Sequence, residues 1–437
     1  MTLALFISAP ASGQGKTTFT AALARLLVRT GKKVRVFKTG PDYLDPQILE
    51  QASRQPVQQL DLWMSGEAWC RHQFYLAAQA ADVIIVEGAM GLLDGTPSSA
   101  DLAATFGIPI LLLMDVSGMA QTAGALAEGL ARHRDDCRMV GLVANNCASQ
   151  RHRELVEETL SAELPLVAAI PRTEGISLPE RHLGLVQAQE VTDELEQCFE
   201  QGADLLEQTD ILRWMESLSP VVFAPAQEAE AEPFKVEPLL AGKTIAIAKD
   251  VAFSFIYDSN IQLLQQMGAR LRYFSPLVDR AIPDCDALWL PGGYPELHAE
   301  RLATNADMLA SLQALHQQGK PILAECGGFL YCLQSITNLQ GEDFAMAGLM
   351  AGRGVMRERG GCQGMQTAPL PEGLVRGHAH HRSASIDTPE PIAYGQRQRH
   401  PAPGEAIYRQ GSLTATYLHL FFASNPAAIA GIFGAKT

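Results

Sequence analysis

Length and composition narrow the class of protein before any motif is considered. At roughly 150 residues per domain, the 437 residues predict two or three domains rather than one. Hydrophobic residues make up 47% and charged residues 19%, which excludes a disordered, collagen-like or coiled-coil chain. Lysine and arginine number 34 against 48 aspartates and glutamates, so the net charge of −14 excludes a large basic surface for nucleic acid or an anionic membrane.

Cysteine usage and hydropathy indicate where the protein works. The eight cysteines are widely spaced and form no CxxC pair, which argues against a disulfide scaffold and favours a reducing cytoplasm. Residues 1–7 lack the basic start and long apolar core of a signal peptide and are typical of a strand. The longest apolar stretch, residues 108–114, is far shorter than the roughly 20 residues of a membrane span. We therefore expect a cytoplasmic protein without a membrane or nucleic-acid partner.

Apolar runs of strand length alternate with segments of helical period, which predicts α/β domains with mainly parallel sheets. A helix is expected over 16–29, where apolar residues recur on one face. Residues 224–241 are rich in Glu, Ala and Pro and are expected to form an exposed linker. The linker divides the chain into domains at 1–223 and 242–437. The expected strands are 3–8, 34–38, 83–87, 110–115 and 140–145 in the first domain, and 244–248, 271–274, 287–290, 321–325 and 413–419 in the second.

The segment after the first expected strand is rich in glycine and leads into the expected helix at Lys16. This context is typical of a P-loop, in which backbone N–H groups face the phosphates of a nucleotide. Lys16 would then reach the β and γ oxygens, and Thr17 would coordinate Mg²⁺. Pro10 stands where a strict Walker A loop has its first glycine. The residues expected to bind the nucleotide are Gly13, Gly15, Lys16, Thr17 and Thr18.

Carboxylates follow two other expected strands of the first domain. Asp42 and Asp45 lie in a turn-rich segment after the second strand, and Glu87 is the last residue of the third. Because open α/β sheets bind ligands beyond the carboxyl ends of their strands, we expect these acids near the P-loop. Oxygen ligands at such a place suit Mg²⁺. The predicted metal ligands are Thr17, Asp42 and Glu87.

A cysteine stands at a tight turn in the second domain. Cys326 follows the expected strand 321–325 and precedes Gly327, which predicts the strand–turn–helix geometry of an exposed nucleophile. A helix N-terminus and a nearby imidazole lower the pKa of a thiol below its usual value of about 8.5. His419, at the end of the expected strand 413–419, is the candidate base because it can share a sheet edge with Cys326.

Backbone groups near this cysteine complete the predicted site. The loop after residues 287–290 carries a Gly-Gly pair, and the N–H groups of Gly293 and Gly327 form a candidate oxyanion hole. The histidines within 378–381 lack the Cys or acidic companions of a metal site, and we assign them no role. Other cysteines, such as Cys332, are expected to be buried apolar residues.

Taken together, these segments resemble the cobyrinic acid a,c-diamide synthase family, which includes the hydrogenobyrinic acid a,c-diamide synthases of corrinoid biosynthesis. The resemblance covers essentially the whole chain. It implies an α/β fold with an N-terminal P-loop domain similar to dethiobiotin synthetase and a C-terminal class I glutamine amidotransferase domain of flavodoxin-like type. The segments that carry it are ASGQGKTT (11–18), GPDYLD (40–45), VEGAMGLLD (86–94), LPERHLG (178–184), LPGGYPE (290–296) and AECGG (324–328).

The resemblance implies ATP-dependent amidation of the a and c acetate side chains of a corrin ring, with glutamine as the nitrogen donor. In the second domain Cys326 would attack glutamine and His419 would manage the protons. In the first domain ATP would phosphorylate the carboxylate, and ammonia would displace the phosphate. Mg²⁺ is the implied cofactor, and ATP, glutamine and a corrinoid acid are the implied partners. The family positions tied to metal binding, catalysis or adenine recognition are Asp42, Tyr43, Asp45, Glu87 and Asn145.

The chain departs from the expected pattern in two places. Phe421 stands where class I glutaminases usually carry the Glu of a His-x-Glu motif, and Ala379 and His380 stand where the family has Glu and an aromatic residue. Several alternatives stay open. The ring is either cobalt-bearing or metal-free, and a homodimer is a candidate assembly. A cobyric acid synthase would amidate other side chains. A P-loop ATPase switch with an inactive glutaminase-like domain would have no need of a thiol at Cys326.

Overall fold

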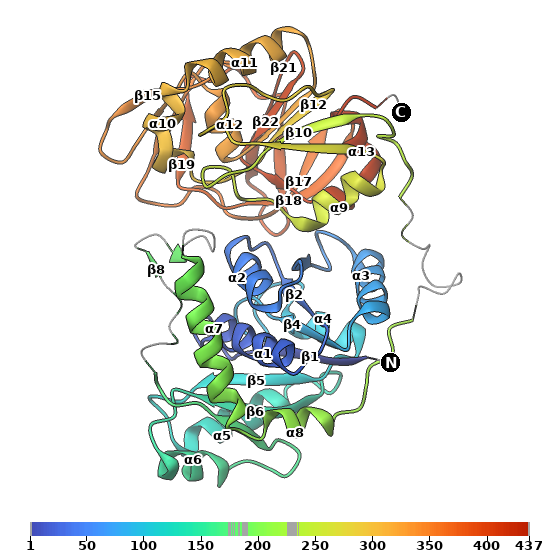
Figure 1. Ribbon diagram of the computed structural model, residues 1–437, viewed down its shortest axis with the longest axis vertical. Helices are drawn as coiled ribbons and strands as arrows, with labels where there is room; N and C mark the ends of the chain where they lie inside the picture. The colour runs from blue at the N-terminus through green and yellow to red at the C-terminus, as the bar shows by residue number, and fades with distance from the viewer. Residues whose placement is uncertain are drawn as a thin grey trace. The chain divides into compact units, whose positions relative to one another are not determined.

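The computed structural model describes residues 2–173, 176, 178, 180–181, 184–185, 191–224, 234 and 236–435. The chain forms two compact units, Met1–Phe234 and Lys235–Thr437, which run from blue to green and from yellow to red in Figure 1. Most of the expected linker, and residues 179, 182 and 183 of the segment 178–184, lie outside the described residues. Within the described part of the chain, no helix has the length and apolar character to cross a membrane.

The first unit is built on a seven-stranded parallel sheet in the order β3-β2-β4-β1-β5-β6-β7. Strands β1, β4 and β5 begin and end where the apolar runs predict, and β2 and β6 are each one residue longer. A separate pair, β8 and β9, is antiparallel. The strands are β1 Leu3–Ser8, β2 Val34–Thr39, β3 Gln58–Leu60, β4 Val83–Glu87, β5 Ile110–Asp115, β6 Met139–Asn145, β7 Leu166–Ala169, β8 Glu180–Arg181 and β9 Gly184–Leu185.

Helices cover both faces of this sheet, which explains why its central strands are apolar throughout rather than alternating. Leu5 and Ile7 of β1 pack against α1, α2, α7 and α8, whereas Ala4 and Phe6 face α3 and α4. Helix α1 has the predicted bounds. The helices are α1 Lys16–Arg29, α2 Leu44–Ser53, α3 Glu67–Ala80, α4 Ser99–Phe106, α5 Gln121–Ala131, α6 Gln150–Glu157, α7 Thr192–Glu207 and α8 Ile211–Glu216.

The second unit contains a ten-stranded sheet in the order β11-β10-β12-β13-β22-β21-β20-β17-β18-β23, and a four-stranded sheet in the order β15-β14-β16-β19. The first five strands of the larger sheet are parallel, and their order is the 2-1-3-4-5 order of flavodoxin-like folds. The remaining strands of that sheet extend it antiparallel. The parallel strands are β10 Thr244–Ala248, β11 Arg270–Phe274, β12 Ala287–Leu290, β13 Ile322–Glu325 and β22 Leu413–Thr416.

The other elements of the second unit extend the larger sheet, form the smaller sheet, or are helices. The strands are β14 Ser335–Thr337, β15 Asp343–Ala345, β16 Arg353–Met356, β17 Gly364–Leu370, β18 Gly373–Ala379, β19 Ser383–Ile386, β20 Ala393–Arg397, β21 Pro403–Gln410 and β23 His419–Leu420. The helices are α9 Asp258–Gln266, η3 Pro295–His298, α10 Ala299–Thr304, α11 Ala306–Gln317, α12 Gly327–Cys332, η4 Phe422–Ser424 and α13 Pro426–Ile432.

The expected single strand over residues 413–419 is wrong. Strand β22 ends at Thr416, and β23 begins at His419 and pairs with β18 instead. Strands β22 and β23 lie at opposite ends of the run β22-β21-β20-β17-β18-β23, yet only Tyr417 and Leu418 separate them in the chain. This part of the sheet therefore curves back on itself and brings His419 near the carboxyl ends of β22 and β13.

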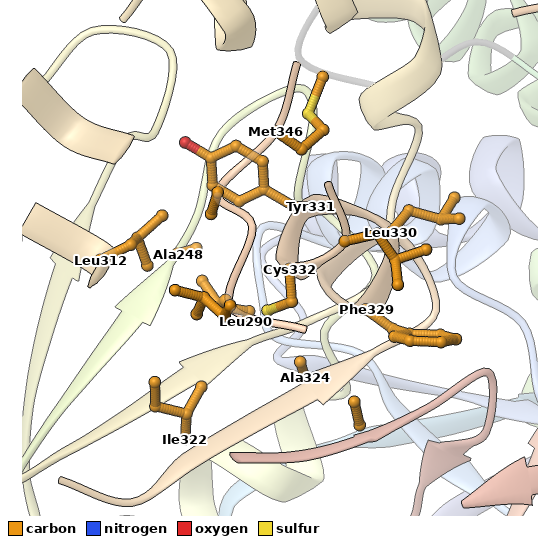
Figure 2. Close-up of a cluster of buried hydrophobic side chains, with 14 of the residues drawn as sticks. Ala248, Leu290, Leu312, Ile322, Ala324, Phe329, Leu330, Tyr331, Cys332 and Met346 are labelled. Atoms are coloured by element: carbon orange, nitrogen blue, oxygen red, sulfur yellow. The ribbon is translucent and has the colours of Figure 1, made fainter. Parts of the chain in front are cut away.

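The apolar core of the second unit surrounds helix α12, directly after Cys326. Figure 2 shows Tyr331 and Cys332 of this helix among side chains from neighbouring elements, including Leu290 and Leu312. Cys332 is fully buried, as predicted for a cysteine that acts as a small apolar residue. Because this packing holds α12 against the sheet, it also fixes the turn that carries Cys326.

Candidate active sites

The P-loop lies between β1 and α1 and has the backbone that its glycines predict. Gly13 and Gly15 have φ values of 74° and 90°, which residues with side chains rarely adopt. A Cβ at Gly15 would also lie 2.6 Å from the amide nitrogen of Asn145, so this position requires glycine for a second reason. Asn145, at the end of β6, donates to the Gln14 carbonyl at 2.9 Å. The expected adenine residue thus lies directly against the P-loop.

Lys16 points toward the loop that follows β4. Its Nζ donates to the Met90 carbonyl at 2.6 Å and to the Ala11 carbonyl at 3.3 Å. The same two loops are joined where the Leu92 N–H donates to the Ala9 carbonyl at 2.8 Å. Burial, together with the Lys38 ammonium, lowers the pKa of Lys16. The P-loop and the segment after β4 therefore meet at one sheet edge, as the sequence predicts.

A charged cluster occupies that edge, with Lys38 at its centre. Lys38 Nζ donates to Asp45 Oδ2 and to Glu87 Oε1, each at 2.6 Å, and lies 3.8 Å from Asp42 Oδ2. Thr17 Oγ1 donates to Glu87 Oε1 at 3.0 Å. The structure thus brings together Thr17, Asp42, Asp45 and Glu87, and it places a buried cation among them that the sequence analysis missed.

Lys38 and the two aspartates beside it shift one another's pKa values. Burial alone would lower the pKa of Lys38, but the carboxylates of Glu87 and Asp45 outweigh it and raise the pKa well above its usual range. Burial would raise the pKa of Asp45, yet Lys38 lowers it. Asp42 lies farther from the ammonium, so burial and the Asp45 charge raise its pKa to about 7. Lys38 and Asp45 are therefore an ion pair at neutral pH.

Asp42 also organises the start of helix α2. Its Oδ1 accepts the backbone N–H groups of Leu44 and Asp45 at 3.0 and 3.1 Å. Asp42 thereby satisfies two N–H groups that the first turn of a helix leaves open. Tyr43, between these residues in the chain, is 9% exposed. Residues 42–45 are held as one unit beside Lys38.

Glu87 and Thr17 present oxygen atoms that a divalent metal could bind. Glu87 is fully buried, and within the described residues its Oε2 has no hydrogen-bond partner. An unpartnered buried carboxylate oxygen is costly unless a cation or water binds it. Across the described residues, no group of three or more His, Cys, Asp and Glu side chains is placed to hold a metal ion. The Glu87 carboxylate and the neighbouring Thr17 hydroxyl are oxygen donors of the kind that fits a hard divalent ion.

A cavity of about 190 Å³ opens beside the P-loop. Gly13, Gly15 and Thr18 line it together with residues of helix α7. Asn145 also lines it, which places the expected adenine residue in the same cavity as the expected phosphate loop. The α7 residues that line it are Gly202, Leu205 and Leu206.

In the second unit, Cys326 stands at a strained turn between β13 and α12. Its φ of 45° and ψ of −103° are unusual for a residue with a side chain. The Cys326 N–H donates to the Thr416 carbonyl at 2.8 Å, which anchors the turn to β22. Gly328 follows because a Cβ there would lie 2.1 Å from the Leu290 carbonyl oxygen. The strand–turn–helix geometry is the one that the Cys-Gly-Gly pattern predicts, but Cys326 is only 5% exposed, so the expectation of an exposed residue at this turn is wrong.

Cys326 and His419 both border Gly292. A Cβ on Gly292 would lie 2.2 Å from His419 Cε1 and 3.4 Å from the Cys326 Cβ. The imidazole ring and the thiol-bearing residue thus meet over a residue that must lack a side chain. The structure brings together the two residues that are 93 positions apart in the sequence.

The expected lowering of the Cys326 pKa is wrong. Burial and the nearby Glu296 raise the pKa of the thiol, and these effects outweigh the backbone N–H of Gly327, which acts in the opposite direction. Burial, followed by the neighbouring His378, lowers the pKa of His419 well below its usual range. Both groups are therefore neutral at pH 7, and proton transfer between them must accompany attack on a substrate.

Gly293 and Gly327 lie side by side, as an oxyanion hole requires. A Cβ on Gly327 would lie 2.9 Å from the Gly293 backbone nitrogen. A Cβ on Gly293 would lie 2.0 Å from the Ala252 carbonyl oxygen, so this loop also depends on glycine. The Gly293 nitrogen thus lies beside Gly327, the residue after Cys326, close to where charge would develop if Cys326 attacked an amide carbonyl.

Two family models match the chain. One for CobQ/CobB/MinD/ParA nucleotide binding domains matches residues 5–186, and one for CobB/CobQ-like glutamine amidotransferase domains matches residues 244–427. The hydrogenobyrinate a,c-diamide synthases of Stutzerimonas stutzeri and Pseudomonas aeruginosa are 47% and 46% identical over 98% of this chain, and the alignments cover 98% and 97% of those proteins. The cobyrinate a,c-diamide synthase of Herminiimonas arsenicoxydans is 46% identical over 98% of this chain and 96% of its own. The chain belongs to the a,c-diamide synthase family.

Membership in the a,c-diamide synthase family confirms the predicted fold classes. The nucleotide-binding match contains the P-loop and the Lys38 cluster, and the glutamine amidotransferase match contains Cys326 and His419. The chain is therefore a glutamine-dependent amide ligase with a nucleotide-binding domain. Each half of the molecule carries one of the two sites.

Sequence reasoning missed three buried groups around these sites. Lys38 was visible as the last predicted residue of a strand, a position that faces the ligand edge. His378 pairs with His419 across β18 and β23, and their ring centroids are 5.0 Å apart. The register of these two strands could not be predicted from the sequence. Glu325 stands next to Cys326 and bonds to β23. Of the other two histidines within 378–381, His381 is buried and bonds Glu405, whereas His380 is exposed.

Proposed function

We propose that this chain catalyses the ATP- and glutamine-dependent amidation of the a and c acetate carboxylates of cobyrinic or hydrogenobyrinic acid. One observation carries the proposal. A single chain contains both a P-loop site and a Cys–His elbow, and 98% of it aligns with relatives named hydrogenobyrinate or cobyrinate a,c-diamide synthase. The relatives carry both substrate names at nearly equal identity. The proposal therefore includes both the metal-free and the cobalt-bearing ring.

The second domain would release ammonia from glutamine. As His419 takes the thiol proton, Cys326 Sγ attacks the side-chain amide carbon, and the N–H groups of Gly293 and Gly327 bind the oxyanion. His419 then gives its proton to the leaving nitrogen, so ammonia departs and a thioester remains. Water cleaves the thioester to glutamate and restores the thiol. The neutral starting states of both residues support this sequence of proton transfers.

The first domain would activate the ring carboxylate. The substrate carboxylate oxygen attacks the γ-phosphorus of ATP, ADP leaves, and ammonia then displaces phosphate from the acyl phosphate to form the amide. Lys16 and Lys38 would stabilise the negative charge on the transferred phosphoryl group. Asp45 and Glu87 hold Lys38 at the sheet edge, and the cavity beside Asn145 would take the adenosine.

Mg²⁺ is the cofactor that we propose for this site. When bound, it would offset the charge of the ATP phosphates. Thr17 and Glu87 would hold the ion or its waters, and Asp42 would complete the acidic side of the site. Among the residues that the structure describes, Glu87 Oε2 has no hydrogen-bond partner, which supports this assignment. The eight free thiols support a location in a reducing compartment such as the cytoplasm.

The test is an end-point mass measurement. Purified protein, ATP, Mg²⁺ and glutamine are incubated with cobyrinic or hydrogenobyrinic acid, beside a Cys326→Ala variant given glutamine or ammonium. We expect one ring to gain two amides and stop, with the variant active only on ammonium. Four amidations would instead indicate a cobyric acid synthase. ATP hydrolysis without amidation of either ring would overturn the proposal in favour of an ATPase switch.

A further inference from the structure

The proposed glutaminase site lacks the acid that usually orients its histidine, because Phe421 stands two residues after His419. A buried acid lies elsewhere, directly before the nucleophile in the chain. Glu325 ends strand β13 and is 2% exposed. Burying a carboxyl group is costly unless its oxygens are hydrogen-bonded, so the partners of Glu325 explain why it is kept there.

Both oxygens of Glu325 accept a hydrogen bond from a buried donor. Oε1 accepts the backbone N–H of Leu420 at 2.8 Å, and Oε2 accepts the indole N–H of Trp289 at 2.9 Å. Leu420 is the residue after His419 in strand β23. One carboxyl group therefore connects the strand that ends next to Cys326 with the strand that carries His419.

The backbone around His419 is held from other directions as well. Asn260 donates to the Leu420 carbonyl at 2.9 Å and accepts the Phe422 N–H at 2.8 Å. On the other side, β18 lies so close that a Cβ on Gly377 would be 2.1 Å from the His419 carbonyl oxygen. These contacts fix the path of β23, and the Glu325 contact fixes its distance from Cys326.

We propose that Glu325 is the positioning acid of the Cys326–His419 pair. It acts through the Leu420 N–H rather than on the imidazole, and it holds the base against the nucleophile. The inference rests on the proposed glutaminase role of Cys326 and His419. The role usually filled by an acid after the histidine is here filled by the acid before the cysteine.

The amide of glutamine tests this arrangement because it has one acceptor and one donor. In Glu325→Gln, the amide NH₂ must face either the Leu420 N–H or the Trp289 N–H, so one contact is lost. Trp289→Phe removes one of the two donors. In the double variant the amide oxygen can bond Leu420 while its NH₂ faces the space left by the indole nitrogen. Recovery in the double variant is thus specific to the proposed geometry.

The readouts are kcat and KM for glutamine hydrolysis, with ammonium-dependent amidation and thermal melting as checks on folding. We expect Glu325→Gln to lower kcat about 30-fold with little change in KM, as misplacement of a base requires. The double variant should recover to within about threefold of Trp289→Phe alone, because one hydrogen bond is regained. Glu372→Gln is the matched control, since Glu372 bonds Arg409 in the same unit.

Each outcome bears on the inference. Wild-type kcat in Glu325→Gln overturns it, and so does a double variant no faster than Glu325→Gln while both keep ammonium-dependent activity. If Glu325→Gln does not fold, Trp289→Phe/Glu325→Gln decides by itself, because activity near that of Trp289→Phe supports the geometry and loss of kcat in a folded protein contradicts it. If neither variant folds, Glu325 is structural and the inference fails. Glutamine hydrolysis by Cys326→Ala would instead contradict the proposed function, whatever Glu325 does.

Discussion

The two sites of the molecule prepare for chemistry in opposite ways. Around the P-loop, charges are already in place: Lys38 touches Asp45 and Glu87, and the pair of Lys38 and Asp45 stays ionised although both residues are buried. Around the elbow, burial keeps Cys326 and His419 neutral. Phosphoryl transfer needs fixed charge before the substrate arrives, whereas amide cleavage can form its ion pair during the reaction.

The two sites also depend on different kinds of residue. The charged site depends on ion pairs between Lys38 and the neighbouring acids. Removing one member of such a pair leaves its partner buried without an opposite charge. The neutral site depends on close backbone approach at Gly292, Gly293 and Gly327, where a single methyl group collides with its neighbours. Changes of charge and changes of shape should therefore have effects confined to different half-reactions.

Replacing Lys38 should produce the largest effect. Lys38→Met removes the cation between Asp45 and Glu87, and we expect amidation with either nitrogen donor to fall about 10³-fold because phosphoryl-transfer charge is no longer stabilised. Glutamine hydrolysis should continue. Amidation assayed with ammonium, beside glutaminase assays, measures both, and Lys32→Met at an exposed lysine is the control. Equal loss of both activities would show that the two sites are not separable.

A methyl group at Gly292 should damage the other site. Its Cβ would lie 2.2 Å from His419 Cε1, so the imidazole must move away from Cys326. We expect Gly292→Ala to lower glutamine-dependent amidation about 10²-fold, the cost of a misplacement near 1 Å. Ammonium-dependent amidation should be unchanged. Gly129→Ala, where nothing lies within 4 Å of the new Cβ, provides the matched control. A variant with unchanged glutaminase kcat would refute the placement of His419.

Low pH should lower the stability of the protein through His378, which packs against His419. Burial, followed by His380, lowers the pKa of His378 to about 3, so its contribution to stability is present above pH 6.5 and is lost as the pH falls toward 3. The linkage amounts to about 2 kcal/mol at pH 5 for this one histidine. Burial raises the pKa of Glu325 to about 8, and that group has the opposite sign, losing stability as the pH rises through 8.

A His378 variant separates the contribution of this histidine to the pH dependence of stability from that of the other titrating groups. Urea unfolding of the whole chain at pH 8 and pH 5 should show a smaller loss of stability for His378→Asn than for the wild type, since Glu325 is common to both. An identical loss in the two proteins would mean that His378 is protonated without cost.

The smallest effect is expected at Asn145. Asn145→Ala removes the bond to the Gln14 carbonyl and one side of the cavity beside the P-loop. We expect KM for ATP to rise about 10-fold, the cost of one lost hydrogen bond, with little change in kcat. Steady-state ATP titration measures this. A change in kcat alone would place Asn145 with the reacting groups instead of the nucleoside.

The central strands and the P-loop were predictable because both faces of a parallel sheet are apolar and the loop has its own glycine pattern. Strand β17 was not predicted, since its residues alternate between buried and partly buried positions and include Pro369. The pKa of Cys326 was mispredicted because burial of its surroundings is a tertiary property. Glu325 was missed for the same reason: its neighbour in the chain is evident, but its partner, Leu420, depends on the register of β23.

The short connection between β22 and β23 constrains how this domain can change in evolution. The Cys326 N–H is hydrogen-bonded to the Thr416 carbonyl. From Thr416 to His419, three residues of fully extended chain span at most about 11 Å. The reach from nucleophile to base is thus set by covalent length. An inserted or deleted residue here would shift His419 by about 3.4 Å and turn it to the opposite side of the strand. This segment should tolerate substitutions at Tyr417 and Leu418 far better than any change in residue number.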